Sequence, residues 1–339
     1  MADVTPIATG DIQWGGNNDS ALWLKVFGGE VLTQFQTATV ISPLLTSRTI
    51  SSGKSAQFPI TGRTSARYFE PGNNILTDED GEGTPRKYLS GDNSKAEKVI
   101  TINDLLISSF FVDQLDEMKG HYDFRSIYAK ETGQALARHL DRTCMQALVK
   151  ASTTGSNDLT NANAGTSPSA LIDEILAAAQ KLDENDVPRE GRFIVVDPTR
   201  YYLLVRSAND AIAVDTASES SAQGIPQLLD KDFGAFQSGI VARVAGMPVI
   251  MSNNTGFGDS TADYDDAGPG GGDKNDLTHD LSGHVAMVAH GSSAGVLKLK
   301  DIAMEQEYLI NRQGHLIVSK MAVGVNELRT EAAVAIKTA

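Results

Sequence analysis

The longest regular hydrophobic pattern in the chain predicts a single helix from about Asp113 to Ala151. No proline interrupts this stretch, and its apolar residues recur at the spacing of one helix face. Acidic residues come first and basic residues last, as the helix dipole favours. At about 1.5 Å per residue the helix would be roughly 55 Å long, so we expect an elongated or flat subunit. The predicted apolar stripe consists of Leu115, Met118, Tyr122, Ala129, Thr132, Leu136, Leu140 and Leu148.

A second pattern, the alternation of apolar and polar residues, predicts two strands on either side of a long polar segment. The strands are Ser55 to Thr61 and Lys98 to Leu106, and the polar segment is Pro71 to Ser94. This segment is rich in Gly, Pro, Asp and Glu, so it cannot bury a core of its own. Because such a long connection is unusual inside a compact domain, we expect a hairpin that leaves its own subunit and packs on a neighbour.

Helices and strands alternate after the long helix, which predicts a mixed α/β domain, and the remainder of the chain is mostly strand, so the fold class expected for the whole chain is α+β. An apolar stretch at residues 21–35 predicts a short amphipathic helix at the end of an extended arm. Ser167 is expected to cap a helix that has Pro168 at its first position. Strands are predicted at residues 193–196, 247–251, 285–289, 296–302 and 316–325, with a short helix after Pro198.

The chain is acidic, with a formal charge of -14 from 29 Lys and Arg against 43 Asp and Glu. This is the wrong sign for a surface that grips nucleic-acid phosphates, so sequence-specific binding of nucleic acid is not expected. No apolar run approaches the roughly 18 residues of a membrane span, and the N-terminus lacks the pattern of a signal peptide. We therefore expect cytoplasmic synthesis and no membrane partner. Cys144, the single cysteine, is predicted to be a buried apolar filler.

Two short motifs could indicate chemistry, and neither has the surroundings that its chemistry requires. Gly53–Ser55 matches part of a phosphate-binding loop, but Arg48 stands where that motif has its first glycine. Ser293 lies in a Gly-x-Ser-x-Gly pattern, yet the residues after it alternate like a strand where a nucleophile elbow needs a helix. A hairpin turn is the better interpretation. The histidines also lack metal-ligand spacing, so we predict no catalytic, cofactor-binding or metal-binding residue and no enzyme activity.

Several segments resemble the major capsid proteins of T-seven-like podoviruses, including their marine relatives. The most characteristic is Arg48 to Pro59, which gives the glycine, lysine and serine at 53–55 a structural meaning. The other segments are Leu22 to Leu32, Glu97 to Ile102, His121 to Ser126 and Gly295 to Asp301. The resemblance extends from about residue 21 to the C-terminus.

This resemblance implies the Hong Kong phage-type capsid fold, in which hexamers and pentamers form an icosahedral shell around double-stranded DNA. It implies four regions: an N-terminal arm at 1–47, an extended hairpin loop at 48–107, a peripheral domain at 108–160 and 286–339, and an axial domain at 161–285. The implied partners are other copies of the chain, a scaffolding protein during assembly and a portal at one vertex, and a decoration protein is left open. The packaged DNA is expected as non-specific, mostly repelled content of the virion.

Two other functions compete with this interpretation. An encapsulin-type compartment shell would share the fold and would also lack catalytic residues, although Arg48 to Pro59 favours a phage protein. A serine hydrolase built on Ser293 is the enzyme alternative.

Opposite charges on two predicted elements suggest contacts between subunits. Basic residues lie along or near the hairpin loop, and acidic residues lie in the predicted first turns of the long helix. We expect these two groups to face one another across the boundary between neighbouring copies. The residues are Arg63, Arg67, Arg86 and Lys87 on the hairpin, and Asp113, Asp116, Glu117 and Asp123 on the helix.

Overall fold

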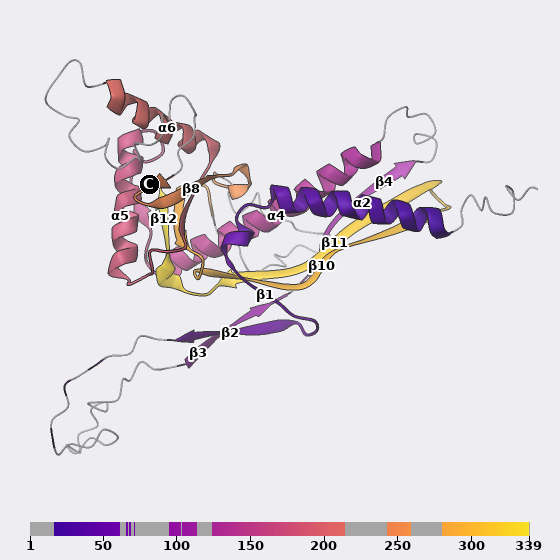
Figure 1. The fold of residues 1–339 in the computed structure, drawn as a ribbon, viewed down its shortest axis with the longest axis horizontal. Helices are drawn as coiled ribbons and strands as arrows, with labels where there is room; N and C mark the ends of the chain where they lie inside the picture. Colours follow the sequence, from indigo (N-terminus) through magenta and orange to yellow (C-terminus); the bar gives the residue numbers. More distant parts are fainter. Residues whose placement is uncertain are drawn as a thin grey trace, which may run out of the picture.

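Two large β-sheets that share one long helix form most of the fold, and a separate two-stranded sheet, β2–β3, lies beside one of them (Figure 1). The computed structural model describes residues 17–61, 66, 68, 71, 95–102, 104–113, 124–213, 243–258 and 280–338. Its helices are α2 (Asn17–Ala38), α4 (Phe124–Thr154), α5 (Pro168–Glu184) and α6 (Pro198–Ala213), with short turns η1 (Ser42–Leu44), η3 (Asn253–Thr255) and η5 (Thr330–Ala332). Its strands are β1 (Thr46–Thr49), β2 (Ser55–Thr61), β3 (Lys95–Thr101), β4 (Leu106–Asp113), β5 (Leu159–Thr160), β6 (Arg192–Val196), β7 (Arg243–Val244), β8 (Met247–Met251), β9 (His284–His290), β10 (Ala294–Leu309), β11 (Gly314–Glu327) and β12 (Ala333–Lys337).

The six-stranded sheet has the order β5-β12-β9-β6-β8-β7 and lies between helices. All five residues of β6 are buried. Ile194 and Val196 pack in one core with α5 and α6, and Phe193 and Val195 pack in another core with α4. Because both faces of the strand are covered, the residues after Arg192 form a continuous apolar run with no alternation.

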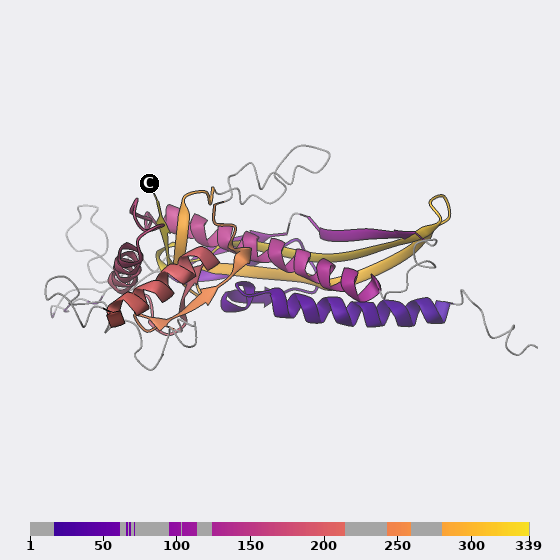
Figure 2. The same cartoon turned by 90° about the horizontal axis from the view of Figure 1, so that it is seen from above.

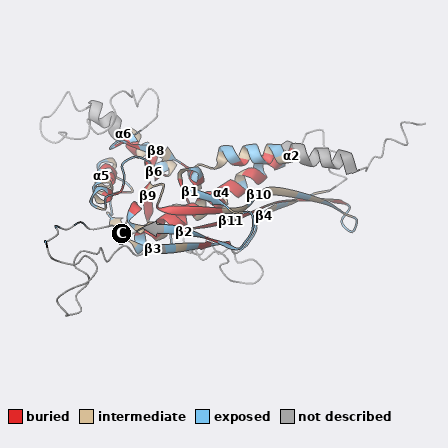
Figure 3. Cartoon of the chain, turned by 60° about the horizontal axis from the view of Figure 1, so that its bottom comes forward, coloured by how far each residue is buried: buried red, intermediate tan, exposed pale blue. Residues whose placement is uncertain are grey.

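The four-stranded sheet has the order β1-β10-β11-β4 and is built on two long antiparallel strands. Its register shifts between Lys298 and Ala303, and such irregularities bend a sheet locally. Neighbouring residues on β11 show which element covers each face: Met321 packs in the core of α4, whereas Ala322 packs under the β2–β3 pair. Buried residues are dense where α4 meets the sheets and sparse at the outer ends of β10 and β11 (Figure 3).

Helix α2 lies alongside α4, and both run along the four-stranded sheet (Figure 2). Phe27, Val31 and Phe35, four residues apart, are all buried on α2. A Cβ atom placed on Gly133 of α4 would lie 2.7 Å from the backbone oxygen of Val31. The helices therefore cross so closely that α4 needs a glycine at the crossing point.

The long helix begins later than its sequence pattern predicts. Asp113 is the last residue of β4, not part of a first helical turn, because Leu106–Asp113 pair residue by residue with β11. Helix α4 has 31 residues, which corresponds to about 46 Å. The buried residues Ala129, Thr132, Leu136, Leu140 and Leu148 confirm the part of the predicted stripe that lies on α4. The elongated subunit is also confirmed (Figures 1 and 2).

Other element boundaries were predicted with mixed success. Helix α5 starts at Pro168, but the hydroxyl of Ser167 lies 3.1 Å from that of Ser169 and caps no backbone amide. The helix predicted at residues 21–35 is confirmed, and α2 begins four residues earlier and ends three residues later. The predicted strand 98–106 is divided between β3 and β4, which belong to different sheets.

The crossing of α2 and α4 can be tested with two glycine substitutions. Gly133→Ala should lower the free energy of unfolding by about 1 to 2 kcal/mol, because the clash outweighs the gain in helix propensity. Gly29→Ala, on an exposed site of α2 with nothing within 4 Å of the new Cβ, should raise it by up to about 1 kcal/mol. Urea unfolding of the unassembled protein measures both. Equal effects of the two substitutions would contradict the close crossing.

Candidate assembly surfaces

A buried carboxylate on α4 holds the chain that follows the arm helix. Asp141 has no exposed surface, and its oxygens accept hydrogen bonds from the backbone amides of Val40, Ile41 and Ser42 at 2.9, 3.2 and 3.3 Å. The side-chain amide of Asn254, in η3 of the neighbouring sheet, donates to the same carboxylate and to the carbonyl of Ala38. Asp141 therefore joins the arm, the long helix and the end of β8.

Burial and hydrogen bonding act in opposite directions on this carboxyl. Desolvation raises the pKa of Asp141, and it outweighs the hydrogen bonds from the backbone and from Asn254, which lower it. Within the described part of the chain the partners of Asp141 are amides, with no basic side chain among them. The carboxylate thus depends on these amides for its stabilisation.

The β2–β3 pair covers one half of the outer face of the four-stranded sheet, the face turned away from α2 and α4. Ile100 of β3 and Ile102, which follows the strand, pack on Leu297 and Ala322 in a small buried cluster. In Figure 1 the pair lies beside β1 and the adjoining halves of β10 and β11. This half of the outer face is closed by the chain itself.

The other half of the outer face exposes large apolar side chains at the edge strand β4. Phe110 points inward, where its ring stacks on Tyr128 at a centroid distance of 5.0 Å. By strand alternation the odd-numbered residues point outward, and Leu105, Ile107 and Phe111 are 49%, 54% and 40% exposed. An apolar row on an unpaired edge is a surface that proteins normally cover.

Acidic residues border this apolar row. Glu305 and Glu307 on β10 are exposed, and they lie opposite Val318 and Leu316 of the central strand β11. Lys320 forms an ion pair with Glu305. A partner with apolar and basic side chains would suit this half of the sheet.

The predicted contact residues fall mostly outside the described residues. Asp113 lies at the end of β4, so its predicted place on the helix is wrong. The remaining predicted contacts stay predictions. They are Arg63, Arg67, Arg86, Lys87, Asp116, Glu117 and Asp123.

Sequence analysis missed the role of Asp141, although a signal was present. Ala129, Gly133, Ala137 and Asp141 are spaced four residues apart, so they lie in one row on α4. The first three are small residues that face the arm helix or the core. An acid that continues such a row indicates a buried acceptor near the helix it faces.

The structure gives the two sequence motifs structural roles. Gly53 has φ +99°, and the carbonyl of Lys54 accepts the amide of Ile102, so this segment turns the chain into β2. Ser293 is fully buried and its hydroxyl donates to the carbonyl of His290 at 2.7 Å. The turn at Ser293 joins strands of two different sheets, so the predicted hairpin turn is wrong while the predicted strand after it is confirmed. A buried hydroxyl with this partner is not placed to attack a substrate.

In the described residues, no group of three or more His, Cys, Asp or Glu side chains is placed to hold a metal ion. Within the same parts of the chain, no helix combines the length and the apolar character needed to span a bilayer.

Comparison with known proteins identifies the family. A family model described as "Gp10A-like: Major capsid protein" matches residues 57–337. The chain belongs to this family. The major capsid protein of Escherichia phage T7 is 32% identical over 336 residues, covering 93% of this chain and 91% of the relative. The major capsid protein of Enterobacteria phage T3 is 33% identical over 338 residues, with the same coverage of both chains.

Solved capsid structures share the fold of this major capsid protein family member. The capsid of cyanophage P-SCSP1u matches with a TM-score of 0.67 and 28% identity, covering 89% of this chain and 88% of that chain. A virus-like particle from Pyrococcus furiosus matches with a TM-score of 0.53 and 14% identity over 93% and 99% of the two chains, which shows the fold alone. The predicted α+β capsid fold is confirmed.

Substitution of Asp141 tests the joint between arm and long helix. Asp141→Asn keeps the size of the side chain but replaces one carboxylate oxygen by an amide NH2 group. This group is a donor and cannot accept hydrogen bonds from the backbone amides. We expect the free energy of unfolding to fall by about 2 kcal/mol or more, because buried donors lose an acceptor. Asp173→Asn, on the exposed face of α5, should change it by less than about 0.5 kcal/mol. Urea unfolding compares the two, and equal effects would contradict the role of Asp141.

The stability difference between wild type and this variant should depend on pH. Because the pKa of Asp141 is raised in the fold, the folded chain binds this proton more readily than the unfolded chain. Protonation of Asp141 therefore adds to the free energy of unfolding. This contribution is complete below the pKa of Asp141 in the unfolded chain and is lost as the pH rises through its pKa in the folded chain. The D141N variant lacks this group, so wild type should exceed it in stability by more at about pH 4 than at about pH 7. An excess that shrinks on acidification would contradict the raised pKa.

Proposed function

We propose that this chain is the major capsid protein of a short-tailed phage, assembling as hexamers and pentamers into the icosahedral shell that encloses double-stranded DNA. The observation that carries the proposal is the apolar half-sheet at β4, exposed among the described residues, in a chain whose relatives over nine-tenths of their length are capsid proteins. In a shell, a second copy of the chain would cover this half-sheet. The place of the protein is then the virion, after assembly in the host cytoplasm.

Two observations favour a phage shell over the alternatives. The relatives at 32% and 33% identity are capsid proteins of phages, whereas the virus-like particle from Pyrococcus furiosus supports the fold alone. A structural role also suits Ser293, whose hydroxyl is buried and committed to a carbonyl. We infer that the chain acts through its surfaces and not as a hydrolase.

We infer the division into regions from sheet membership. The four-stranded sheet with α4 would form the peripheral domain, and the six-stranded sheet with α5 and α6 the axial domain. Strands β9 and β12 pair within the six-stranded sheet, which favours the axial domain for them instead of the peripheral one expected for residues 286–339. Residues up to 47 would form the arm, and residues 48–107 would contribute the hairpin loop.

Further partners follow from family membership. We infer that a scaffolding protein guides assembly and that a portal occupies one vertex, as the resemblance implies. The charge of -14 suits a wall that contains DNA without adhering to it. A decoration protein would bind on the outside if one is present.

The uncovered half-sheet provides the test of self-assembly. Ile107→Asp should leave the thermal unfolding of unassembled protein nearly unchanged, because Ile107 is 54% exposed. It should reduce the yield of shells by about tenfold or more, because a carboxylate would be buried in an apolar interface. Ile107→Val is the matched control and should assemble like wild type. Electron microscopy after co-expression with the scaffolding protein counts the shells, and normal yields from the aspartate variant would contradict the interface.

Shortening the hairpin loop tests its proposed inter-subunit role. Replacing residues 73–92 by a short Gly/Ser turn should spare folding, because this polar segment contributes little apolar burial to its own subunit. Shell closure should fail or be misdirected. Circular dichroism and thermal unfolding of unassembled protein report the fold, and microscopy reports the shells. Loss of the fold, or normal shells at normal yield, would contradict this assignment.

A further inference from the structure

The β2–β3 pair packs closely on the four-stranded sheet at one end. We call this contact, between Gly324 of β11 and residues 101–102, the root of the hairpin. A Cβ atom placed on Gly324 of β11 would lie 2.5 Å from the carbonyl oxygen of Thr101 and 3.1 Å from Cγ1 of Ile102. Strand β3 therefore lies directly against the backbone of β11. The apolar cluster around Ile100 closes this contact.

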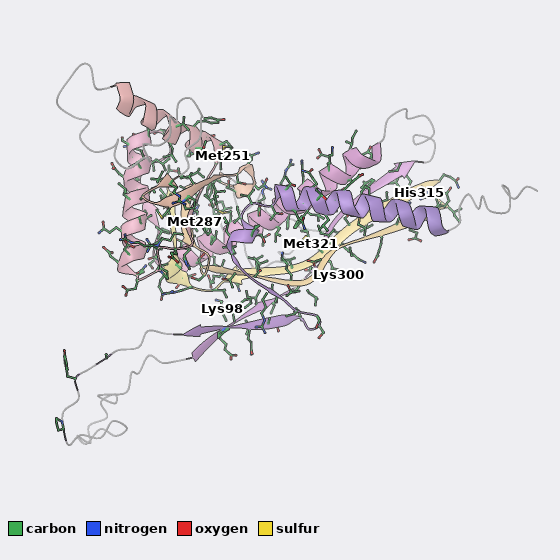
Figure 4. The ribbon with its side chains drawn as sticks, in the orientation of Figure 1. Lys98, Met251, Met287, Lys300, His315 and Met321 are labelled. Carbon is green, nitrogen blue, oxygen red and sulfur yellow. The ribbon has the colours of Figure 1, made fainter. Side chains whose placement is uncertain are left out.

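One carboxylate joins this root to the end of the long helix. Glu327 is the last residue of β11, and its side chain is only 6% exposed. Its Oε1 accepts a hydrogen bond from Nζ of Lys98 on β3 at 2.7 Å. Its other oxygen accepts the hydroxyl of Thr154, the last residue of α4, at 3.3 Å. Figure 4 shows Lys98 on β3, beside the four-stranded sheet. The hairpin, the sheet and the helix thus meet at one side chain.

The ion pair between Lys98 and Glu327 constrains the orientation of β3 on the sheet, which the apolar contacts alone do not. Apolar burial depends on area and tolerates sliding or rotation of one surface on another. A charge-assisted hydrogen bond prefers a narrow range of distance and angle, and it is strong where water is excluded. The side chain of Glu327 is shielded from water, while that of Lys98 is 34% exposed, so the pair is screened from one side and restricts the orientation of β3 through its geometry.

Small changes of angle at this root would be amplified along the hairpin. The seven residues of β2 extend about 20 Å at about 3.3 Å each. A rotation of about 10° at the root would move the end of such a strand by about 3.5 Å, which is comparable to the spacing between packed atoms. Contacts made beyond the strand would be displaced further.

We propose that Glu327, through Lys98, is a positioning residue that sets the direction in which the hairpin leaves the subunit, and with it the angle between neighbouring subunits. This inference rests on the proposed shell function. Glu327 would act on shell geometry, while the two hydrophobic cores keep the subunit folded without it.

The test compares variants of the full-length chain. Glu327→Gln removes the ion pair, Lys98→Gln removes it from the other side, and Glu97→Gln alters an exposed acid on the same strand as a control. The double variant K98E/E327K reverses the pair. Hydrogen exchange at residues 95–102 is measured on unassembled protein, and the size and shape of particles are measured by electron microscopy after co-expression with the scaffolding protein.

We expect Glu327→Gln and Lys98→Gln to speed exchange in β3 by about tenfold and to raise the share of misshapen particles at least about threefold. The control should match wild type, and the reversed pair should restore part of both properties. Wild-type exchange and normal particles in both single variants would overturn the inference, as would a reversed pair no better than they are. If wild type itself formed no shells, the shell function would fail, while the exchange data would still judge the role of Glu327. Should Glu327→Gln not fold, its positioning role is refuted, because the cores were taken to fold without it.

Discussion

The burial of α4 between two sheets and the arm helix is the interaction on which the rest of the structure depends. Its residues Leu140, Met145 and Leu148 share one core with β6, β9 and β12 of one sheet and with β10 and β11 of the other. At Gly133 its opposite side touches the backbone of α2. Since one rigid helix contributes to each of these contacts, the two sheets and the arm keep a fixed arrangement without a large interface of their own.

The two elements that leave this body are held by buried carboxylates of different kinds. Asp141 binds the chain after the arm through backbone amides, so the contact requires a particular backbone shape but no particular side chain at residues 40–42. Glu327 binds the hairpin through the side chain of Lys98. The first contact resists changes of sequence in the arm, whereas the second can be altered by one substitution. In a shell, each subunit must contact its neighbours at defined angles. Both carboxylates lie where an extended element, the arm or the hairpin, joins the body of the subunit.

Local patterns predicted the elements that have one dominant environment. The start of α5 at Pro168 and the strands β2, β6 and β8 were found within a residue, because their periodicity and turn residues agree with their packing. The predicted start of the long helix was wrong because an acidic residue such as Asp113 suits a first helical turn, and only its pairing with Gly314 of β11, distant along the chain, places it in β4. Asp141 and the uncovered half-sheet could not be read directly from the sequence, since each depends on segments distant along the chain.

We propose that the outer face of the four-stranded sheet, open at β4 in the single subunit, is closed by a second copy in the shell. The most direct measurement is hydrogen exchange at residues 106–113, compared between unassembled protein and purified shells. We expect exchange at this edge strand to slow strongly on assembly, while exchange in β6 at residues 192–196, already buried in the subunit, should change little. Unchanged exchange along β4 in closed shells would contradict it.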